Sequence, residues 1–324
     1  METIHRVLVS SLAVGSTECI PQYLFRATSN ESRGTNTPQT IAPDARPHAR
    51  VEQIHKPRHM IIEHLEYRYR TPSEFVSWSS SLMFVLIHAT RKQNSSRESN
   101  VQIVILDTHK LQIDQAEQLR GRCAIYPAPT LCRIFNVPNQ GVTRYAGLIH
   151  EYLFHGRLHN SGCYQMLPFH RLIDRGLYAW FPELFSPQKF LWRRVTELRS
   201  TTFAPKTETV SMKDIRMAKR LGECFSKDFS LPMTMAFMTM KKLPWRWESR
   251  TLPTIARNLC GMTVPETYTD SQWQDEYAVY EEEGLDEVTQ FRNIMRALVA
   301  YYKQEGEKAL ACHAMEMNSS TSFW

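Results

Sequence analysis

The front of the chain contains short apolar runs of the kind that form β-strands. Residues 101–106 are β-branched and nearly continuously apolar, which predicts a strand inside a sheet. Residues 23–25 are apolar and are followed by Arg26, whereas residues 151–158 suit a strand interrupted at Gly156. These runs predict a sheet built from sequence-distant strands.

Helical spacing appears between these runs. Residues 82–90 predict a buried helix that starts directly after a group of serines, which are good N-caps. Residues 52–69 predict a surface helix and residues 169–179 a helix packed against the sheet. Residues 27–48 are rich in Ser, Thr, Asn and Pro, so we expect a long loop there.

Beyond residue 200 the pattern is helical throughout. Residues 211–225 begin with a serine cap and place apolar residues on one face, and residues 286–302 form the clearest amphipathic pattern in the chain. Residues 231–240 are rich in methionine, which is typical of core that fills gaps.

Together these patterns predict an α+β fold in which a mixed domain precedes an all-helical C-terminal region. We expect an N-terminal segment over residues 1–19, the mixed domain over 20–200, the helical region over 201–311 and a flexible tail over 312–324.

Composition indicates an intracellular protein, cytoplasmic or nuclear. The seven cysteines form no C-x-x-C pair, which argues against a zinc site and a disulfide scaffold. No apolar run is long enough to cross a bilayer, and the start of the chain is too interrupted for a secretory signal. We therefore expect no membrane association.

The net charge of +6 does not by itself indicate nucleic-acid binding. Residues 213–257 contain ten basic and four acidic residues, and residues 266–287 contain nine acidic residues and no basic ones, so the two blocks can neutralise each other. Only residues 245–247 (Trp-Arg-Trp) interleave basic and aromatic side chains as a nucleic-acid surface does. A nucleic-acid partner is therefore disfavoured.

Several common active-site motifs are absent from the sequence. There is no phosphate loop, no G-x-G-x-x-G dinucleotide loop and no G-x-S-x-G nucleophile elbow. His150 and His155 flank Glu151, but a separation of five residues would place the two imidazoles ~140° apart around a helix. We expect no metal.

Three chemically useful side-chain types lie at the ends of the predicted front strands. Arg26 ends the first apolar run, residues 75–81 (Phe-Val-Ser-Trp-Ser-Ser-Ser) form a serine cluster, and Glu151 opens a later run. Each has an ordinary structural role, as a surface ion pair, as helix caps or as an exposed charge. A functional site requires all three to converge on one cleft.

In this order the three elements resemble the R-S-E signature of ADP-ribosyltransferase-like folds. A longer pattern, over about residues 20–200, resembles an uncharacterised fungal domain of unknown function. The strings that carry it are Tyr23-Leu24-Phe25-Arg26, Ser32-Arg33-Gly34-Thr35, residues 75–82, residues 104–108, Glu151-Tyr152-Leu153 with Gly156, and residues 172–178.

The transferase resemblance implies NAD as substrate, cleaved at the nicotinamide N-glycosidic bond through an oxocarbenium-like transition state. Glu151 would accept a hydrogen bond from the ribose 2′-hydroxyl and stabilise the developing positive charge. Arg26 would hold the ribose and phosphate, because its planar donor fork matches oxyanions.

The same resemblance gives the neighbouring residues supporting roles. Ser79, with Ser77 and Ser81 as alternatives, would orient Glu151 or the ribose. Tyr23 and Trp78 would offer stacking surfaces for nicotinamide.

One departure separates this chain from transferases that modify arginine. Those enzymes carry a second acid two residues before the catalytic glutamate, where this chain has Ile149. The resemblance thus disfavours arginine as acceptor but leaves another protein acceptor open. The alternative is an inactive domain that binds a protein partner through its helical region. The oligomeric state is not indicated by the sequence.

Overall fold

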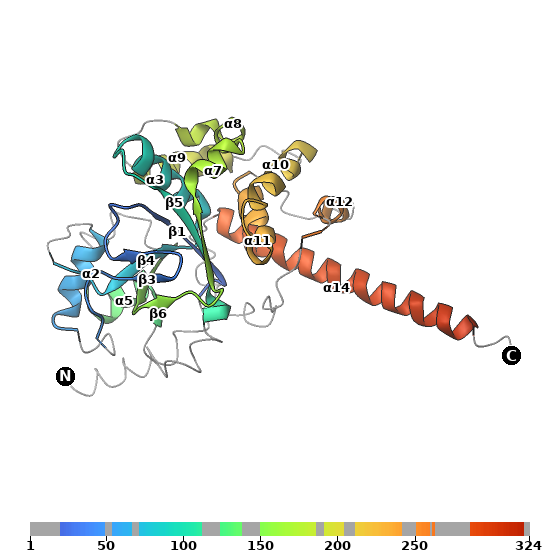
Figure 1. The fold of residues 1–324 in the computed structure, drawn as a ribbon, viewed down its shortest axis with the longest axis horizontal. Helices are drawn as coiled ribbons and strands as arrows, with labels where there is room; N and C mark the ends of the chain where they lie inside the picture. Colours follow the sequence, from blue (N-terminus) through green and yellow to red (C-terminus); the bar gives the residue numbers. More distant parts are fainter. Residues whose placement is uncertain are drawn as a thin grey trace.

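A six-stranded antiparallel sheet forms the centre of the protein, described here from a computed structural model (Figure 1). Its strand order is β6-β7-β4-β1-β5-β9. The strands are β1 (Tyr23–Thr28), β4 (Phe75–Ser79), β5 (Gln102–Asp107), β6 (Ala124–Pro127), β7 (Glu151–His155) and β9 (Tyr164–Pro168). The structure describes residues 20–48, 54–66, 71–111, 124–137, 150–185, 191–203, 211–241, 251–259, 261–262 and 286–320.

The apolar run at residues 101–106 forms an interior strand, as predicted. β5 pairs with β1 on one side and with β9 on the other, and residues 103–106 are completely buried. A continuously apolar strand is stable there because both faces of the sheet are covered.

A second sheet lies where we expected a long loop. β2 (Thr35–Asn36) and β3 (Thr40–Ala42) pair with each other, and β3 also pairs with β8 (Leu158–His159). The prediction over residues 27–48 was therefore wrong in this part, because strands of two or three residues leave no periodicity to read. Gly156, at φ +124°, makes the predicted interruption between β7 and β8.

Helices connect several strands of the main sheet and continue the chain after its last strand. Those before residue 200 are α2 (Pro57–Leu65), α3 (Leu82–Asn94), α5 (Ala128–Ile134), α7 (Phe169–Asp174), α8 (Leu177–Trp180), the 3₁₀ turn η3 (Pro182–Phe185) and α9 (Leu191–Thr202). After it come α10 (Met212–Gly222), α11 (Lys227–Met238), α12 (Thr251–Asn258) and α14 (Asp286–Ser320). In the part of the chain that the structure describes, regular structure beyond residue 203 is entirely helical.

Serine caps start the helices that we expected them to start. The side chain of Ser81 accepts a hydrogen bond from the main-chain nitrogen of Phe84 at the start of α3. Ser211 does the same for Asp214 at the start of α10. Each hydroxyl satisfies one of the amides that an α-helix leaves without an internal partner.

Two helical expectations need correction. The single helix expected at residues 169–179 is divided into α7 and α8 by Gly176, whose φ of +101° cannot continue a helix. α14 runs to Ser320 and extends away from the rest of the molecule (Figure 1), into the segment expected as a flexible tail. Residues 307–317 contain mostly good helix formers and neither glycine nor proline.

One hydrophobic core joins the front and rear of the chain. It contains residues of β1, β5 and α3 together with buried residues of α9, α10, α11, α12 and α14. The methionines of α11, including Met233, Met235 and Met238, are buried in it. The core thus continues across residue 200, where we had drawn a domain boundary.

Two smaller apolar clusters complete the packing around the sheet. One lies on the opposite face and includes Leu24, Trp78 and Phe154 with Ile41 of the small sheet. The other joins α2 and α5 to Phe75 and Leu153, on the same face as Phe25 of the main core. Polar residues of β4 and β7 therefore lie between two apolar clusters.

Some predictions concern residues outside the described ranges. These are the N-terminal segment 1–19, the Trp-Arg-Trp string at 245–247, Ile149, and the acidic block except for Asp286 and Glu287. Within the described ranges, no helix combines the length and the apolar character needed to span a membrane.

Candidate functional site

Strand β4 brings the predicted site residues together. On one side it pairs with β7, which places Ser79 directly opposite Glu151, and on the other side it meets β1. Arg26, Ser79 and Glu151 therefore come from three adjacent strands. All three line one pocket.

Strands β1 and β4 pair at one position only, Phe25 opposite Ser79. Side chains alternate between the faces of a regular sheet, so Arg26 would share a face with Trp78 and point away from Glu151. Next to this pair β1 and β4 are not paired with each other, and there the guanidinium of Arg26 turns towards β4. It donates to the main-chain oxygen of Ser77 at 2.8 Å and to Asn36 at 3.3 Å.

The pocket occupies the polar gap between the main core and the cluster that joins α2 and α5 to the sheet. Its volume is about 620 Å³, within the range of sites that enclose a small molecule. Residues of β1 and β4 form its floor, α3 contributes Phe84, His88, Arg91 and Lys92 on one side, and His64 of α2 lies on the other.

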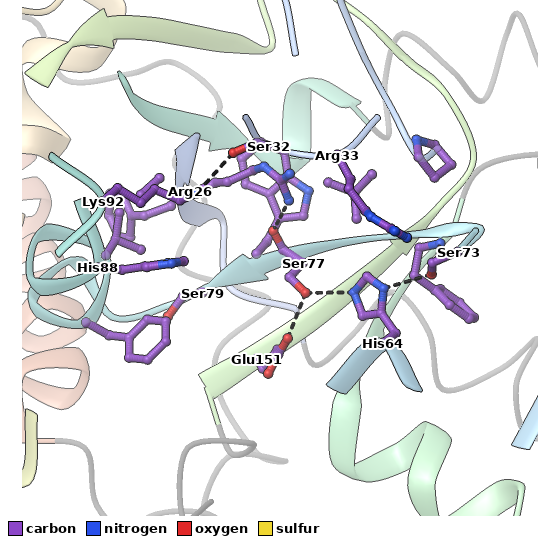
Figure 2. Close-up of a pocket in the computed structure, with 18 of the residues that line it drawn as sticks. Arg26, Ser32, Arg33, His64, Ser73, Ser77, Ser79, His88, Lys92 and Glu151 are labelled. Atoms are coloured by element: carbon purple, nitrogen blue, oxygen red, sulfur yellow. Dashed lines mark hydrogen bonds between the residues drawn. The ribbon is translucent and has the colours of Figure 1, made fainter. Parts of the chain in front are cut away.

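A chain of hydrogen bonds crosses the pocket (Figure 2). The hydroxyl of Ser77 donates to the carboxylate of Glu151 at 2.7 Å and also contacts Nε2 of His64 at 2.8 Å. Nδ1 of His64 lies 2.7 Å from the hydroxyl of Ser73. Ser77 therefore connects the carboxylate, the imidazole and, through its main-chain oxygen, the guanidinium of Arg26.

The environment raises the pKa of Glu151 to about 7. Burial is the dominant cause, because it disfavours the charged carboxylate, whereas the hydrogen bond from Ser77 and the charge of Arg26 act in the opposite direction. A carboxyl group in this position gains and loses its proton near neutral pH.

The three histidines that line the pocket, His64, His88 and His150, are neutral at that pH. Burial lowers the pKa of His64 to about 3, and the charge of Arg26 adds to the effect. The pKa of His88 is also lowered to about 3, by burial and then by Lys92, Arg91 and Arg26. These three cations line the same side of the pocket as His88.

Ion pairs fix part of the pocket rim. Lys92 lies 2.7 Å from Glu98 and donates to Ser32 at 3.2 Å, and Arg33 pairs with Asp44 at 3.2 Å. The lining as a whole carries no excess of cations, because Glu31 and Glu66 also line it. Positive charge is concentrated on the α3 side, where Arg26 and Arg91 add to Lys92.

Ser79 lines the pocket, but its hydroxyl serves the local backbone. It accepts a hydrogen bond from the main-chain nitrogen of Ser81 at 3.1 Å. Ser81 is fully buried, caps α3 and donates to Glu287 at 2.6 Å. Among the three candidate serines, Ser77 is the one whose hydroxyl contacts Glu151.

The two aromatic residues expected to stack on nicotinamide are part of the core. Tyr23 is 2% exposed, packs edge-on against Phe291 and does not line the pocket. Trp78 is also 2% exposed, and its ring lies in the apolar cluster on the opposite face. Neither ring offers an open face to a ligand in this structure.

His64 and Ser73 were not predicted as site residues. The spacing of histidines along residues 52–69 indicated only a surface helix. Ser73 lies in the connection between α2 and β4. The available signal was a histidine eleven residues before a serine-rich strand, which is too common to select one residue.

Within the described ranges, no group of three or more His, Cys, Asp or Glu side chains is arranged to hold a metal ion. The chemistry open to the pocket is that of a carboxylate, a hydroxyl and several cations.

The fold and pocket define an α+β domain of an uncharacterised class. The sequence profile of a family described as "Domain of unknown function (DUF7587)" matches residues 19–168. This range contains the whole six-stranded sheet and every residue that lines the pocket. This part of the chain is similar to that uncharacterised domain, and it ends earlier than the resemblance that we expected to extend to about residue 200. No curated protein and no solved structure matches the chain.

Proposed function

We propose that the pocket binds NAD and cleaves the bond between nicotinamide and ribose, as ADP-ribosyltransferases and NAD glycohydrolases do. The observation that supports this most is the linkage of Arg26, Ser77 and Glu151 across three adjacent strands. An arginine, a serine and a glutamate in one pocket match the chemical requirements of the reaction.

The carboxylate of Glu151 has the central role. As the C1′–N bond breaks, its electron pair passes to the pyridinium nitrogen, neutral nicotinamide leaves, and positive charge develops on the ribose ring. A preorganised carboxylate stabilises that charge more in the transition state than in the substrate. Water or a protein nucleophile then bonds to C1′ and loses a proton.

Ser77 takes the orienting role in this proposal, in place of Ser79. Its hydroxyl holds one carboxylate oxygen of Glu151, which leaves the second oxygen for the ribose 2′-hydroxyl. The hydroxyl of Ser79 is already used by the backbone of Ser81.

The cations on the α3 side suit the two phosphates of a dinucleotide. Arg26, Arg91 and Lys92 all act on His88, so their charges reach the same part of the pocket. Arginine donors match phosphate oxygens in geometry as well as charge. The volume of about 620 Å³ is consistent with a ligand of nucleotide size.

A protein acceptor other than arginine, or water, completes the proposed reaction. If the pocket does not cleave NAD, the alternative is an inactive domain that recognises a protein partner. Its prediction rested on the helical region, and many of the apolar residues that the structure describes there are buried in the shared core.

The test measures nicotinamide released from NAD by the purified full chain and by Glu151→Gln. The amide keeps the size of the side chain but lacks the charge, so we expect release to fall by on the order of 10²-fold or more. Glu183→Gln is the matched control, because Glu183 is exposed in η3 and lies outside the pocket. We expect it to behave as wild type.

Two results would contradict the proposal. Release that does not exceed background, with water or with candidate protein acceptors, would favour the inactive domain. Equal release by wild type and Glu151→Gln, with both folded alike by circular dichroism, would remove Glu151 from the mechanism.

A further inference from the structure

Hydrogen bonds connect the side chains of Ser73, His64, Ser77 and Glu151 in a chain. These groups carry few hydrogens, so only a few placements of the hydrogens satisfy every contact. The hydroxyl of Ser77 carries one hydrogen but lies within hydrogen-bond distance of both Glu151 and Nε2 of His64. One of these partners must therefore donate to Ser77. Neutral His64 likewise carries a hydrogen on only one ring nitrogen.

With Glu151 ionised, a single arrangement satisfies every contact. The carboxylate can only accept, so Ser77 donates to it, and Nε2–H of His64 donates to Ser77. Nδ1 of His64 then accepts from Ser73, whose oxygen also accepts from the main-chain nitrogen of Phe75 at 3.1 Å. All hydrogens point towards Glu151.

With Glu151 protonated, the same atoms support the reverse arrangement. The carboxyl O–H donates to Ser77, Ser77 donates to Nε2 of His64, and the hydrogen of the imidazole moves to Nδ1. Nδ1–H then donates to Ser73, which is free to accept because its own hydrogen can turn to the pocket. No heavy atom has to move.

We infer that this chain of four side chains reverses its direction when Glu151 gains or loses a proton, and that His64 changes tautomer as it does so. His64 is accordingly a positioning residue for Glu151. This inference deepens the proposed function. The reversal itself follows from the hydrogen bonds, and only its role in the reaction rests on the proposed function.

The surroundings favour a tautomer change over a charged imidazole. Arg26 of β1 faces both His64 and Glu151, and Phe75 of β4 packs its ring against His64. From α5, Cys132 faces Glu151, and the pKa of its thiol is raised to about 11 by burial and by that carboxylate, so it stays neutral. Arg26 and burial both oppose a second proton on His64.

Reversal would let Glu151 act in both halves of the proposed reaction. The ionised carboxylate faces the developing cation first. When a hydroxyl acceptor bonds to C1′, its proton passes to Glu151 and later to solvent. Because the chain turns round, the new carboxyl O–H keeps its hydrogen bond to Ser77, and the side chain stays in place in both states.

The experiment is a ¹⁵N nuclear magnetic resonance titration of the full chain with labelled histidine, recorded without NAD. His64 is assigned by the loss of its signals in His64→Phe. Long-range ¹⁵N–¹H correlations distinguish the Nδ1–H tautomer, the Nε2–H tautomer and the imidazolium. We expect Nε2–H at about pH 8.5, Nδ1–H at about pH 5.5 and a midpoint near the Glu151 pKa of about 7.

Matched serine variants test the route. Ser77→Ala removes the hydroxyl between His64 and Glu151, so the pH dependence of the His64 tautomer should disappear. Ser79→Ala removes a neighbouring hydroxyl of the same strand that contacts neither residue, so the dependence should remain. Glu151→Gln should hold one tautomer at every pH, since an amide does not titrate.

The inference is overturned if His64 keeps one tautomer across this range in the wild type, if it becomes an imidazolium, or if Ser77→Ala still switches. These readouts do not depend on turnover. If His64 changes tautomer but the protein releases no nicotinamide, the proposed function alone is overturned. If the protein releases nicotinamide but His64 keeps one tautomer, the hydrogen-bond chain alone is overturned.

Discussion

The guanidinium of Arg26 is anchored on the main-chain oxygen of Ser77, 2.8 Å away, and so on the residue whose hydroxyl holds Glu151. The cation and the carboxylate are thereby positioned by one residue of β4. This arrangement depends on the β1–β4 ladder having a single pair, at Phe25 and Ser79.

Replacing Arg26 by lysine should therefore impair the site although the charge is kept. An ammonium group is a compact point charge and cannot reproduce the fork that contacts both Ser77 and Asn36. We expect nicotinamide release to fall by on the order of 10²-fold. Arg175→Lys, at an exposed position after α7, should leave release unchanged. Wild-type turnover by Arg26→Lys would show that the charge alone suffices.

Glu151 should make the protein less stable as the pH rises. Its pKa is about 7 when folded and 4.5 in its ordinary state, so between these values the folded protein holds a proton that the unfolded chain has lost. The stability it contributes is thus present below about pH 4.5 and lost as the pH rises to about 7.

Glu151→Gln removes this dependence. Comparing urea unfolding of both proteins at about pH 5 and about pH 8, we expect the wild type to lose stability relative to the variant by up to about 3 kcal/mol. Other groups titrate alike in both proteins, so the difference isolates Glu151. Parallel stability profiles would mean that its pKa is not raised.

Ser77→Ala should move the pH profile of the reaction upwards. The hydrogen bond from Ser77 lowers the pKa of Glu151, so its removal raises that pKa further. The rise of kcat/KM with pH, which we expect near pH 7 in the wild type, should then occur at a higher pH. Ser79→Ala should keep the wild-type midpoint. An unshifted midpoint in Ser77→Ala would exclude Ser77 as the residue that sets the ionisation of Glu151.

A buried ion pair secures α14 to the front of the chain. Arg199 of α9 contacts the carboxylate of Glu287 at 2.6 Å, and the side chains are 13% and 4% exposed. Glu287→Ala leaves Arg199 without this partner, so we expect a loss of about 3–5 kcal/mol in the free energy of unfolding.

An exposed pair provides the control for that measurement. Lys219 of α10 and Glu223, the C-cap residue of that helix, lie 3.8 Å apart with side chains 27% and 56% exposed, so Lys219→Ala should cost less than about 1 kcal/mol. Urea unfolding curves of the two variants give the comparison. A loss for Glu287→Ala as small as that for Lys219→Ala would mean that the buried carboxylate contributes little.

Periodicity predicted the larger elements because burial imposes it directly. β5 and α3 are covered on the faces that their apolar residues indicated, and the serine caps of α3 and α10 hold the ends that we expected. The small sheet was missed because its strands are too short to show alternation. Its pairing with β8 links residues more than a hundred positions apart.

The choice among the serines could not come from the sequence. Ser79 is directly opposite Glu151 in the register, yet its hydroxyl turns to the backbone of Ser81 at the start of α3. Ser77, the diagonal neighbour, reaches the carboxylate instead. Side-chain direction at a strand end depends on the next element as well as on register, and His64 enters from a helix whose docking no local pattern encodes.

The core shared across residue 200 also separates two meanings of the word domain in this chain. Residues 19–168 form a unit of sequence similarity that carries the complete pocket. They do not form a unit of burial, because Phe25, Met83 and Leu86 pack in a cluster whose other members come largely from α9 to α14. A fragment cut at residue 168 would expose that apolar surface to water, so the smallest piece that can carry the chemistry is longer than the piece that carries the similarity.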